Sequence, residues 1–223
     1  VDEVFPEVIA LTSLAPTANG AILIGGTTEQ SNQPVLLRLD TADGEITDTG
    51  FRFPIKGSEG SYARSVGDKI HNSLVPGNGP FADRYLIGHG SHVWWDSGGW
   101  PFDPENFSGG AICAFSLNTG ETEKIGIPVM RNTVHGLFGG DGFAVGFSLP
   151  DNHFFSFDYS TREMIDFGRL SSYCCHGFVC HGRRAYGIYR RSVGEQRGDL
   201  ILSSNHAGFL FIYDHDARRM QRT

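Results

Sequence analysis

One phrase recurs four times along the chain, and this repeat limits the possible folds more than any other feature. Each copy is an apolar run, a polar turn and a second short strand-like run, which predicts a β-hairpin because Asp, Asn and Gly supply the turn geometry. The turns are anchored at Asp40, Ser116, Asp158 and Asp214, which lie 76, 42 and 56 residues apart. A blade of four strands takes about 40–50 residues. A spacing of 42 residues therefore corresponds to one blade without an insertion, and the longer spacings correspond to blades that carry insertions.

Two further apolar segments precede each hairpin and complete four strands per repeat. They cover residues 9–14 and 21–27, 69–75 and 84–92, 133–138 and 142–149, and 174–179 and 184–191. No segment of useful length has a helical period. The sequence therefore predicts an all-β fold, a β-propeller of four-stranded antiparallel blades. At least four blades are expected, at about residues 6–58, 60–126, 127–168 and 169–223, in one propeller domain or in a fragment of a seven-bladed one.

The charge balance narrows the classes of partner. The formal net charge is −7, which argues against nucleic acid as a partner because phosphate contacts need a basic surface. An acidic protein can still bind a polyanion through local positive charge. No apolar run reaches the length of about 18 residues that would indicate a membrane span, and the first residues do not have the pattern of a signal peptide. The oligomeric state is left open.

Alignment of the repeats brings three histidines to one position. His71, His135 and His176 each follow an apolar or small residue and precede a small one, whereas the first repeat has Thr12 there. The first strand of a propeller blade lines the central channel, so equivalent positions form a ring around it. Imidazoles in such a ring can carry out acid–base chemistry. The alternative is a structural role, in which each histidine hydrogen-bonds a neighbouring blade.

Polar residues also end two of the second strands. His89 and His92 lie in the second repeat, and Arg190 and Arg191 lie in the fourth. If these strand ends turn toward one face, then His71, His92, Tyr173 and Arg190 meet in one canyon. For His89, Arg183, Arg184 and Arg191 we favour a solvated loop or turn instead.

A metal site is the competing interpretation of a short cysteine–histidine cluster, which consists of Cys174, Cys175, His176, Cys180 and His181. Strand alternation places Cys174 and His176 on one face and Cys175 on the other. A tetrahedral zinc site would therefore need a ligand from elsewhere, such as His206. The four cysteines lack zinc-finger or CxxC spacing, and the metal ligands stay unassigned. The chain also has no Gly-x-Ser-x-Gly elbow and no phosphate-binding loop.

Four features taken in order resemble the propeller-type polysaccharide lyases, most closely the seven-bladed ulvan lyases. They are the phrase Lys-Ile-His-Asn-Ser-Leu-Val at 69–75, a second histidine 21 residues after His71, the phrase Gly-Ala-Ile-Cys-Ala-Phe-Ser at 110–116, and Tyr173 followed 17 residues later by Arg190. The resemblance covers most of residues 60–192. A seven-bladed lyase would need about three more blades than the four repeats supply.

The resemblance implies β-elimination at a uronic acid. His71 and Tyr173 would act as base and acid, in an order left open. Arg190, with Arg191 as the fallback, would neutralise the sugar carboxylate, and His92 would orient it. The expected substrate-binding residues are His135, Asn72, His89, Arg191, Trp95 and His176. Trp94, Trp95 and Trp100 could stack on sugar rings, although packing over a blade is the commoner use of such residues.

The resemblance also implies an anionic polysaccharide as the partner, a secreted or periplasmic location, and chemistry that needs no cofactor. A structural metal ion is left open. Two other functions remain in view, because a fold does not decide a function. One is a non-catalytic propeller module that binds carbohydrate or protein, and the other is a metal-dependent propeller enzyme.

Overall fold

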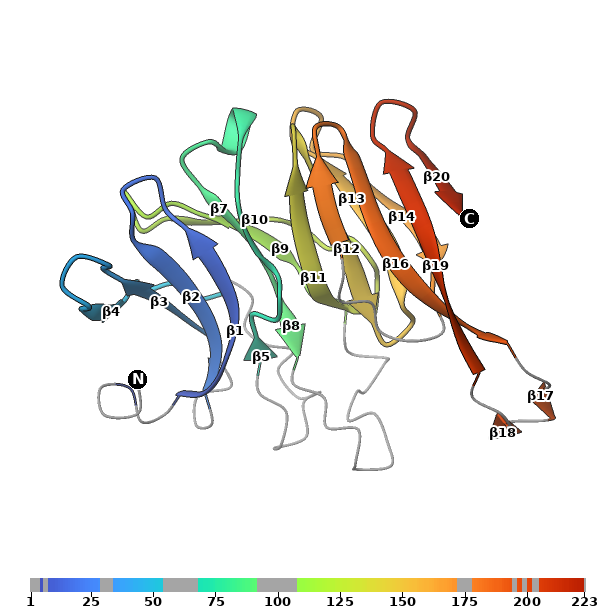
Figure 1. Ribbon diagram of the computed structural model, residues 1–223. Helices are drawn as coiled ribbons and strands as arrows, with labels where there is room; N and C mark the ends of the chain where they lie inside the picture. The colour runs from blue at the N-terminus through green and yellow to red at the C-terminus, as the bar shows by residue number, and fades with distance from the viewer. Residues whose placement is uncertain are drawn as a thin grey trace.

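Figure 1 shows the computed structural model of the chain as a fan of β-sheets. The structure describes residue 5 and residues 8–28, 34–53, 68–91, 108–171, 178–193, 196–197, 200–201 and 205–222. Within these ranges the only helix is the three-residue 3₁₀ helix η1 (Gly79–Phe81). No helix among the described residues is long and apolar enough to cross a membrane.

Four antiparallel sheets of four strands each make up the fan. Blade 1 contains β1 (Val8–Pro16), β2 (Ile22–Thr28), β3 (Val35–Leu39) and β4 (Ile46–Asp48). Blade 2 contains β6 (Leu74–Pro76), β7 (Tyr85–Gly88), β9 (Ile112–Phe115) and β10 (Thr122–Gly126). Blade 3 contains β11 (Thr133–Gly140), β12 (Phe143–Leu149), β13 (His153–Asp158) and β14 (Met164–Arg169). Blade 4 contains β15 (Phe178–His181), β16 (Arg184–Val193), β19 (Asn205–Asp214) and β20 (Arg219–Arg222).

Two short pairs of strands form separate two-stranded sheets. Strand β5 (Asp68–Lys69) pairs with β8 (Gly90–Ser91), and β17 (Gln196–Arg197) pairs with β18 (Leu200–Ile201). Each blade is a meander in which successive strands are neighbours. The prediction of an all-β fold built from four-stranded antiparallel blades is confirmed.

The four repeat anchors close the outer hairpins with their side chains. The Oδ1 atoms of Asp40 and Asp214 accept hydrogen bonds from backbone amides two and three residues ahead, at 3.0 Å in each case. Asp158 Oδ1 accepts two such bonds at 2.9 Å, from Ser160 and Thr161. These contacts are the reason that a short polar side chain recurs at the start of each turn.

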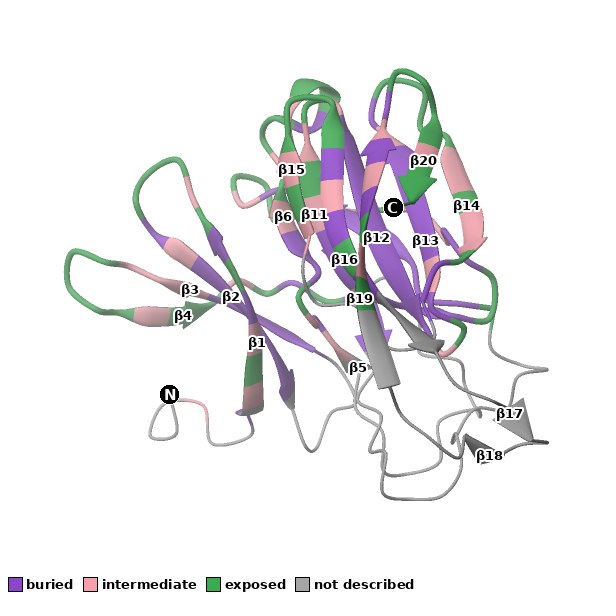
Figure 2. Ribbon diagram, turned by 45° about the vertical axis from the view of Figure 1, so that its right-hand side comes forward, coloured by how far each residue is buried: buried purple, intermediate pink, exposed green. Residues whose placement is uncertain are grey.

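The first strand of each blade lies on the inner side of the fan. Strand β1 contacts β6, β6 contacts β11, and β11 contacts β15, so the inner strands follow one another from blade to blade. Figure 2 shows the buried residues running through the middle of the sheets and the exposed ones at the hairpin tips. The inner-strand positions of the repeats therefore face a common axis, as the propeller prediction requires.

Apolar side chains fill the spaces between successive blades. We call the side of a blade that faces the next blade its leading face, and the side that faces the previous blade its trailing face. The cluster between blades 1 and 2 includes Leu23, Leu36, Tyr85, Ile87 and Cys113, the one between blades 2 and 3 includes Leu86, Ile112, Ala144, Phe155 and Phe157, and the one between blades 3 and 4 includes Phe143, Val145, Phe147, Tyr189 and Phe211. Strand alternation gives each blade two apolar faces.

The inner strand of blade 2 is broken, which the sequence did not predict. Instead of one strand over residues 69–75, β5 and β6 are separated at Asn72, whose φ is +46°. The Thr12 hydroxyl donates to the Ile70 carbonyl at 2.6 Å, the Asn72 amide donates to the Thr12 carbonyl at 3.2 Å, and the Leu137 amide donates to the Asn72 carbonyl at 3.0 Å. The backbone here bonds to blades 1 and 3 rather than to its own blade.

We expect Gly110→Ala to lower the free energy of unfolding by about 1–3 kcal/mol, the usual cost of forcing a methyl group into a packed site. A Cβ at Gly110 would lie 2.2 Å from the His89 carbonyl oxygen and 3.0 Å from the Val134 amide nitrogen. Urea unfolding measures the change. Gly208→Ala is the control, because its nearest neighbour, Ile188 Cγ2, is 3.7 Å away. An equal loss in both variants would contradict the steric explanation.

Candidate functional site

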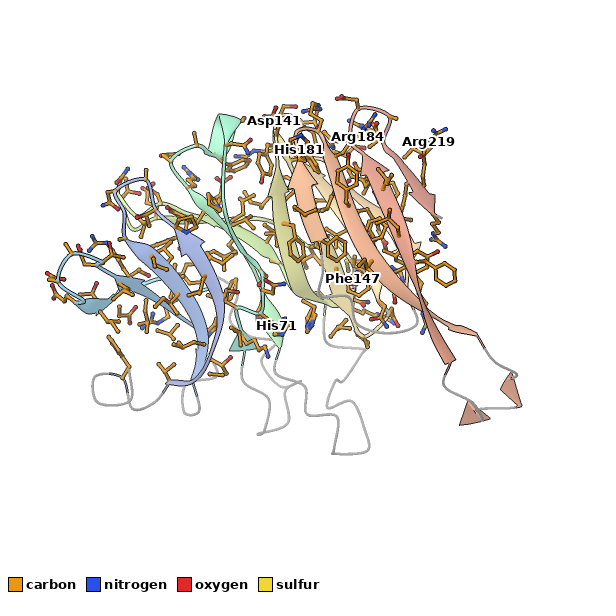
Figure 3. The ribbon with its side chains drawn as sticks, in the orientation of Figure 1. His71, Asp141, Phe147, His181, Arg184 and Arg219 are labelled. Atoms are coloured by element: carbon orange, nitrogen blue, oxygen red, sulfur yellow. The ribbon has the colours of Figure 1, made fainter. Side chains whose placement is uncertain are left out.

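The inner strands bring two of the aligned histidines into contact. The rings of His71 and His135 stack with their centroids 3.8 Å apart and their planes 24° apart. His71 Nδ1 lies 2.8 Å from the His135 carbonyl oxygen. Both residues are half-buried. Figure 3 places His71 at the end of the fan where β5 and β8 lie.

The hydrogen bond to His135 determines the tautomer of His71. A carbonyl oxygen can only accept, so Nδ1 of His71 must carry the proton that is donated. In the neutral ring the lone pair is then on Nε2. His71 is therefore held with a basic nitrogen at the ring position opposite its backbone contact.

Backbone contacts fix the two histidines relative to each other. The Val134 amide donates to the His89 carbonyl at 2.9 Å, and the His89 amide donates to the Ala111 carbonyl at 2.9 Å. A Cβ at Gly88 would lie 2.3 Å from Val134 Cγ1, so glycine is needed for the close approach of β7 and β11. The start of β11, and with it His135, is thereby attached to blade 2.

His89 does not lie in solvent, and our prediction of a solvated loop or turn there is wrong. Its side chain is only 2% exposed, and its ring packs against Phe53 with the centroids 4.6 Å apart. Phe53 follows blade 1 in the sequence, so the ring fills the space between blades 1 and 2. In this arrangement His89 has no surface for a polysaccharide, and its place among the expected substrate-binding residues is corrected to a packing role.

Of the other expected site residues, only Asn72, Arg190 and Arg191 lie within the described part of the chain. Asn72 is exposed beside His71, at the positive-φ turn between β5 and β6. Arg190 and Arg191 lie on β16, paired with Gly208 and Ala207 of β19. Strand β16 starts at Arg184, at the end of the fan opposite His71, and runs toward the His71 end (Figure 3). His92, Trp94, Trp95, Trp100, Tyr173 and His176 lie outside the described residues.

Arg183 and Arg184 behave as expected for a solvated turn. Both are exposed. Arg183 lies in the turn between β15 and β16 and pairs with Asp216, and Arg184 begins β16 and pairs with Asp214 at 3.0 Å. Arg184 lies at the end of the fan away from His71 (Figure 3), and Arg183 precedes it directly in the chain.

The cysteine–histidine cluster is described only at Cys180 and His181. Burial raises the pKa of the Cys180 thiol to about 11, and its sulfur lies 3.8 Å from the Phe138 carbonyl oxygen. A thiol in such surroundings stays protonated, whereas zinc binds the thiolate. Among the residues that the structure describes, no three His, Cys, Asp or Glu side chains are grouped so that they could hold a metal ion.

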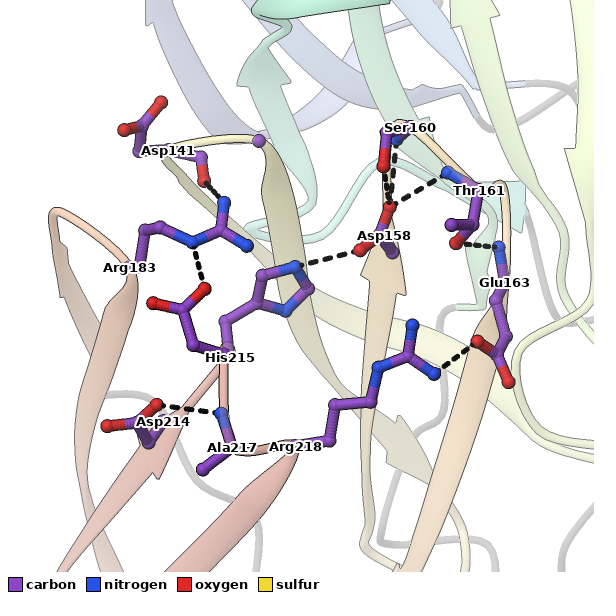
Figure 4. Close-up of polar contacts among 12 residues, drawn as sticks. Asp141, Asp158, Ser160, Thr161, Glu163, Arg183, Asp214, His215, Ala217 and Arg218 are labelled. Carbon is purple, nitrogen blue, oxygen red and sulfur yellow. Dashed lines mark hydrogen bonds and ion pairs between the residues drawn. The ribbon is translucent and has the colours of Figure 1, made fainter.

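A buried polar network that the sequence did not predict lies at the opposite end of the fan (Figure 4). His215 Nε2 lies 3.0 Å from Asp158 Oδ2, and His215 Nδ1 lies 3.2 Å from the Tyr213 hydroxyl. Since the carboxylate can only accept, Nε2 carries the proton and the Tyr213 hydroxyl donates to Nδ1. His215 also stacks on Phe143 at 4.4 Å, so the network joins blades 3 and 4. The sequence feature that could have indicated this network is the position of His215, which directly follows the turn anchor Asp214 of the fourth repeat.

The two titratable groups of this network have shifted pKa values. Burial acts to raise the pKa of Asp158, but hydrogen bonds from Thr161 and Ser160 outweigh it and hold this pKa far below its usual value. Burial of the His215 ring, together with the charge of Arg183, lowers the pKa of His215, although the Asp158 carboxylate acts in the other direction. The network therefore consists of a carboxylate and a neutral imidazole.

We expect this network to make the protein less stable in acid. Folding lowers the pKa of His215. Below about pH 6.5 the unfolded state therefore binds a proton on this ring that the folded state does not bind, so the free energy of unfolding falls as the pH drops. Melting temperatures at pH 7 and pH 5 measure this loss. His215→Phe should lose less between the two values than the wild type. His181→Gln, at an exposed position, should lose as much as the wild type, and an unchanged loss in His215→Phe would refute the assignment.

A cavity of about 640 Å³ opens between blades 1 and 2, lined in part by Thr17, Arg38 and Arg84. Both guanidinium groups already have carboxylate partners. Arg38 pairs with Asp40 at 3.0 Å, and Arg84 pairs with Glu123 at 2.7 Å. An anionic ligand would have to displace these carboxylates, so the histidine pair is the stronger candidate for a site.

No protein-family model and no curated protein matches the chain. Solved structures do. Puromycin hydrolase is 9% identical with a TM-score of 0.56, over 96% of this chain and 28% of that one. The β-propeller domain of the Trilobed protease from Pyrococcus furiosus is 9% identical with a TM-score of 0.51, over 97% of this chain and 57% of that one. Oligogalacturonate lyase from Vibrio parahaemolyticus is 9% identical with a TM-score of 0.50, over 97% of this chain and 54% of that one.

These likenesses bear on the architecture. The chain spans between 28% and 57% of the length of those three proteins. At such low identity the match is in the course of the backbone, and a fold of this kind hosts many unrelated activities. Together with the four meanders and their inner strands, the matches show that the chain has a β-propeller fold.

Proposed function

We propose that this chain carries the site of a polysaccharide lyase that cleaves a uronate-containing, ulvan-like glycan by β-elimination. The observation that carries the proposal is the stacked pair of His71 and His135 on adjacent inner strands. The Nδ1 hydrogen bond of His71 leaves its lone pair on Nε2. An imidazole that is oriented in this way, with its basic nitrogen at Nε2, is the kind of base that this reaction needs.

In the proposed reaction, His71 Nε2 removes the proton from C5 of the uronate. The electron pair of that bond forms the C4–C5 double bond, and the bond between C4 and O4 breaks. O4 leaves with a proton donated by the Tyr173 hydroxyl. Of the two orders that the resemblance leaves open, this one is favoured by the tautomer of His71. This elimination step requires no oxidant and no second reactant.

Proton removal at C5 is slow unless the neighbouring carboxylate is neutralised. Arg190 supplies the charge in this proposal, because a guanidinium pairs with a carboxylate through two parallel hydrogen bonds. Its place on β16, a strand that runs toward the His71 end of the fan, is compatible with that role. Arg191 is the neighbouring alternative on the same strand.

The remaining residues would hold the sugar chain. Asn72 is exposed next to His71 and can donate to hydroxyl or carboxylate oxygens. His135 supports the base by stacking and through its carbonyl. In the same proposal His92 orients the carboxylate, Trp95 stacks on a sugar ring, and His176 extends the row of histidines.

One of the similar structures adds a fold-level analogy. The protein from Vibrio parahaemolyticus is by its title an oligogalacturonate lyase, so a propeller is an architecture on which uronate elimination occurs. At 9% identity this raises the plausibility of the reaction class and transfers no residue.

The test is the absorbance of the unsaturated uronate that elimination produces. We expect it to rise when the protein is mixed with ulvan or another uronate polymer, and not with a polymer whose carboxylates have been reduced. Tyr173→Phe and Arg190→Ala should each abolish the rise. Arg184→Ala, an exposed arginine at the other end of the fan, is the matched control and should keep it.

Three results would count against the lyase. The proposal would be refuted if no uronate polymer caused the absorbance to rise. It would also be refuted if the rise survived in both variants. A rise that is lost on chelation would instead identify a metal-dependent enzyme.

A non-catalytic module is the second candidate function. The match to the Trilobed protease is to its β-propeller domain, which is a part of a larger protein, and propellers commonly present a binding face without chemistry. Binding of a uronate polymer without any product would favour this function.

A further inference from the structure

Three arginines have a backbone conformation that arginine rarely adopts. The φ angles of Arg131, Arg162 and Arg218 are +59°, +60° and +46°. These values lie in the left-handed region that glycine and asparagine favour. A larger residue there is strained, and such strain gathers where a side chain has a task. The three arginines can therefore be compared by what their guanidinium groups contact.

Two of these arginines join neighbouring blades. Arg162, in the hairpin after β13, pairs with Glu123 of blade 2 at 2.5 Å. Arg218, in the hairpin after β19, pairs with Glu163 in the outer hairpin of blade 3 at 2.5 Å. In both cases the strained residue presents an exposed guanidinium to a carboxylate of the preceding blade.

Arg131 has the same backbone conformation but no carboxylate partner. It is exposed, and its guanidinium forms no hydrogen bond or ion pair among the described residues. The Asp151 carboxylate, which lies beside the next residue in the chain, accepts from Asn132 Nδ2 at 2.8 Å instead. A guanidinium that no carboxylate of the protein neutralises is available to an anion from outside it.

The backbone that carries Arg131 is held in place on both sides. The Arg131 amide donates to the Ser108 carbonyl at 3.0 Å. The next residue, Asn132, is only 2% exposed. Its Oδ1 accepts from the Ser148 hydroxyl at 3.2 Å and from the Asp151 amide at 2.9 Å. The guanidinium is therefore attached at a fixed point, which lowers the cost of ordering it when a ligand binds.

Arg131 lies at the same end of the fan as His71. Strand β11 ends next to Asp141, which Figure 3 places at the end opposite His71. Arg131 precedes the start of that strand. It is four residues before His135, so the two Cα atoms are at most about 14 Å apart, and the His135 ring stacks on His71. One extended polymer can therefore contact both His71 and Arg131.

We propose that Arg131 binds an anionic group on a different sugar of the polymer from the one that reacts at His71. The inference rests on the proposed uronate-containing substrate, whose charged groups recur along its length. The ligand is a carboxylate or a sulfate ester, since a guanidinium binds either one through charge-assisted hydrogen bonds. The contact is the same in the ground state and the transition state, so it lowers KM and leaves kcat unchanged.

Arg131→Asn tests the contact, because asparagine tolerates a positive φ but has no charge. We expect KM for ulvan to rise about 3–10-fold, as for the loss of one accessible charged hydrogen bond, with kcat unchanged. Arg131→Lys keeps the charge and should keep most of the affinity. Arg162→Asn is the matched control, because it removes the charge of an arginine with the same backbone conformation in an outer hairpin, and its KM should not change.

Two further polymers identify the anion. If the difference in KM between the wild type and Arg131→Asn persists with desulfated ulvan and with polygalacturonate, the anion is a carboxylate. If the difference is found with ulvan only, the anion is a sulfate ester. In either case it should shrink at high salt, because accessible charges are screened.

The inference and the lyase proposal fail in different ways. If no unsaturated uronate forms, the lyase proposal fails, but weaker binding of ulvan to Arg131→Asn in titration calorimetry would still support the contact. If product forms and Arg131→Asn has the KM of the wild type for all three polymers, this inference is overturned and the lyase stands. Equal losses in Arg131→Lys and Arg131→Asn, or an equal rise in KM for Arg162→Asn, would also overturn it.

Discussion

His71→Gln is expected to lower kcat for uronate elimination by about 10²–10⁴-fold, the usual contribution of a positioned general base, with little change in KM. Glutamine keeps much of the bulk of the ring but has no nitrogen that can take a proton at neutral pH. The rate of formation of unsaturated uronate at saturating substrate measures the loss.

Two other histidines serve as controls for this prediction. His135→Gln removes the stacked ring but keeps the backbone carbonyl that accepts from His71 Nδ1, so its effect on kcat should be much smaller. His181 is exposed at the opposite end of the fan (Figure 3), and His181→Gln should have no effect. A His71 variant that stays as active as His181→Gln would show that another group is the base.

Asp158→Ala is expected to lower the free energy of unfolding by about 3 kcal/mol, because it leaves the buried proton of His215 Nε2 without an acceptor. The carboxylate also accepts from the Ser160 hydroxyl at 2.7 Å and from the amides of Ser160 and Thr161 at 2.9 Å. The outer hairpin of blade 3 and the contact with blade 4 are therefore weakened together. Urea unfolding at pH 7 measures the change, and Asp158→Asn, which keeps one acceptor, should lose less.

A hydrogen bond at the surface between a histidine and a carboxylate provides the comparison. His153 Nδ1 lies 2.9 Å from Asp166 Oδ2, but both side chains are partly exposed. Asp166→Ala should cost less than about 1 kcal/mol, as exposed pairs usually do. If the two alanine variants lose the same amount, the buried network has no special role in stability.

The blades could be predicted from the sequence because their determinants are local. Turn residues such as Asp40 and Asp158 bond to amides two or three positions ahead, and strand alternation is visible within a few residues. The alignment of His71 with His135 also followed from the repeat. Their stacking did not, because it depends on the offset between two blades and on the Asn72 turn that breaks the inner strand.

Contacts between distant segments account for what was missed. His89 is buried by Phe53, which comes from another blade and gives no sign in the sequence around His89. His215 is on an outer hairpin, where a polar residue normally lies in water, and only the fold brings it to Asp158 and Phe143. Pattern reasoning places a side chain on a face of a strand, but it cannot say what covers that face.

The inner strands also carry a consequence for how the protein opens. Backbone hydrogen bonds run from Asn72 to Thr12 and from Leu137 to Asn72, so three blades share main-chain contacts. Repeat proteins whose units touch only their neighbours can lose those units one at a time. Here the amide protons of Asn72 and Leu137 are released only when a boundary between blades separates. Deuterium uptake at the Asn72 amide should therefore report the opening of the boundary between blades 1 and 2, and uptake at the Leu137 amide the opening of the boundary between blades 2 and 3.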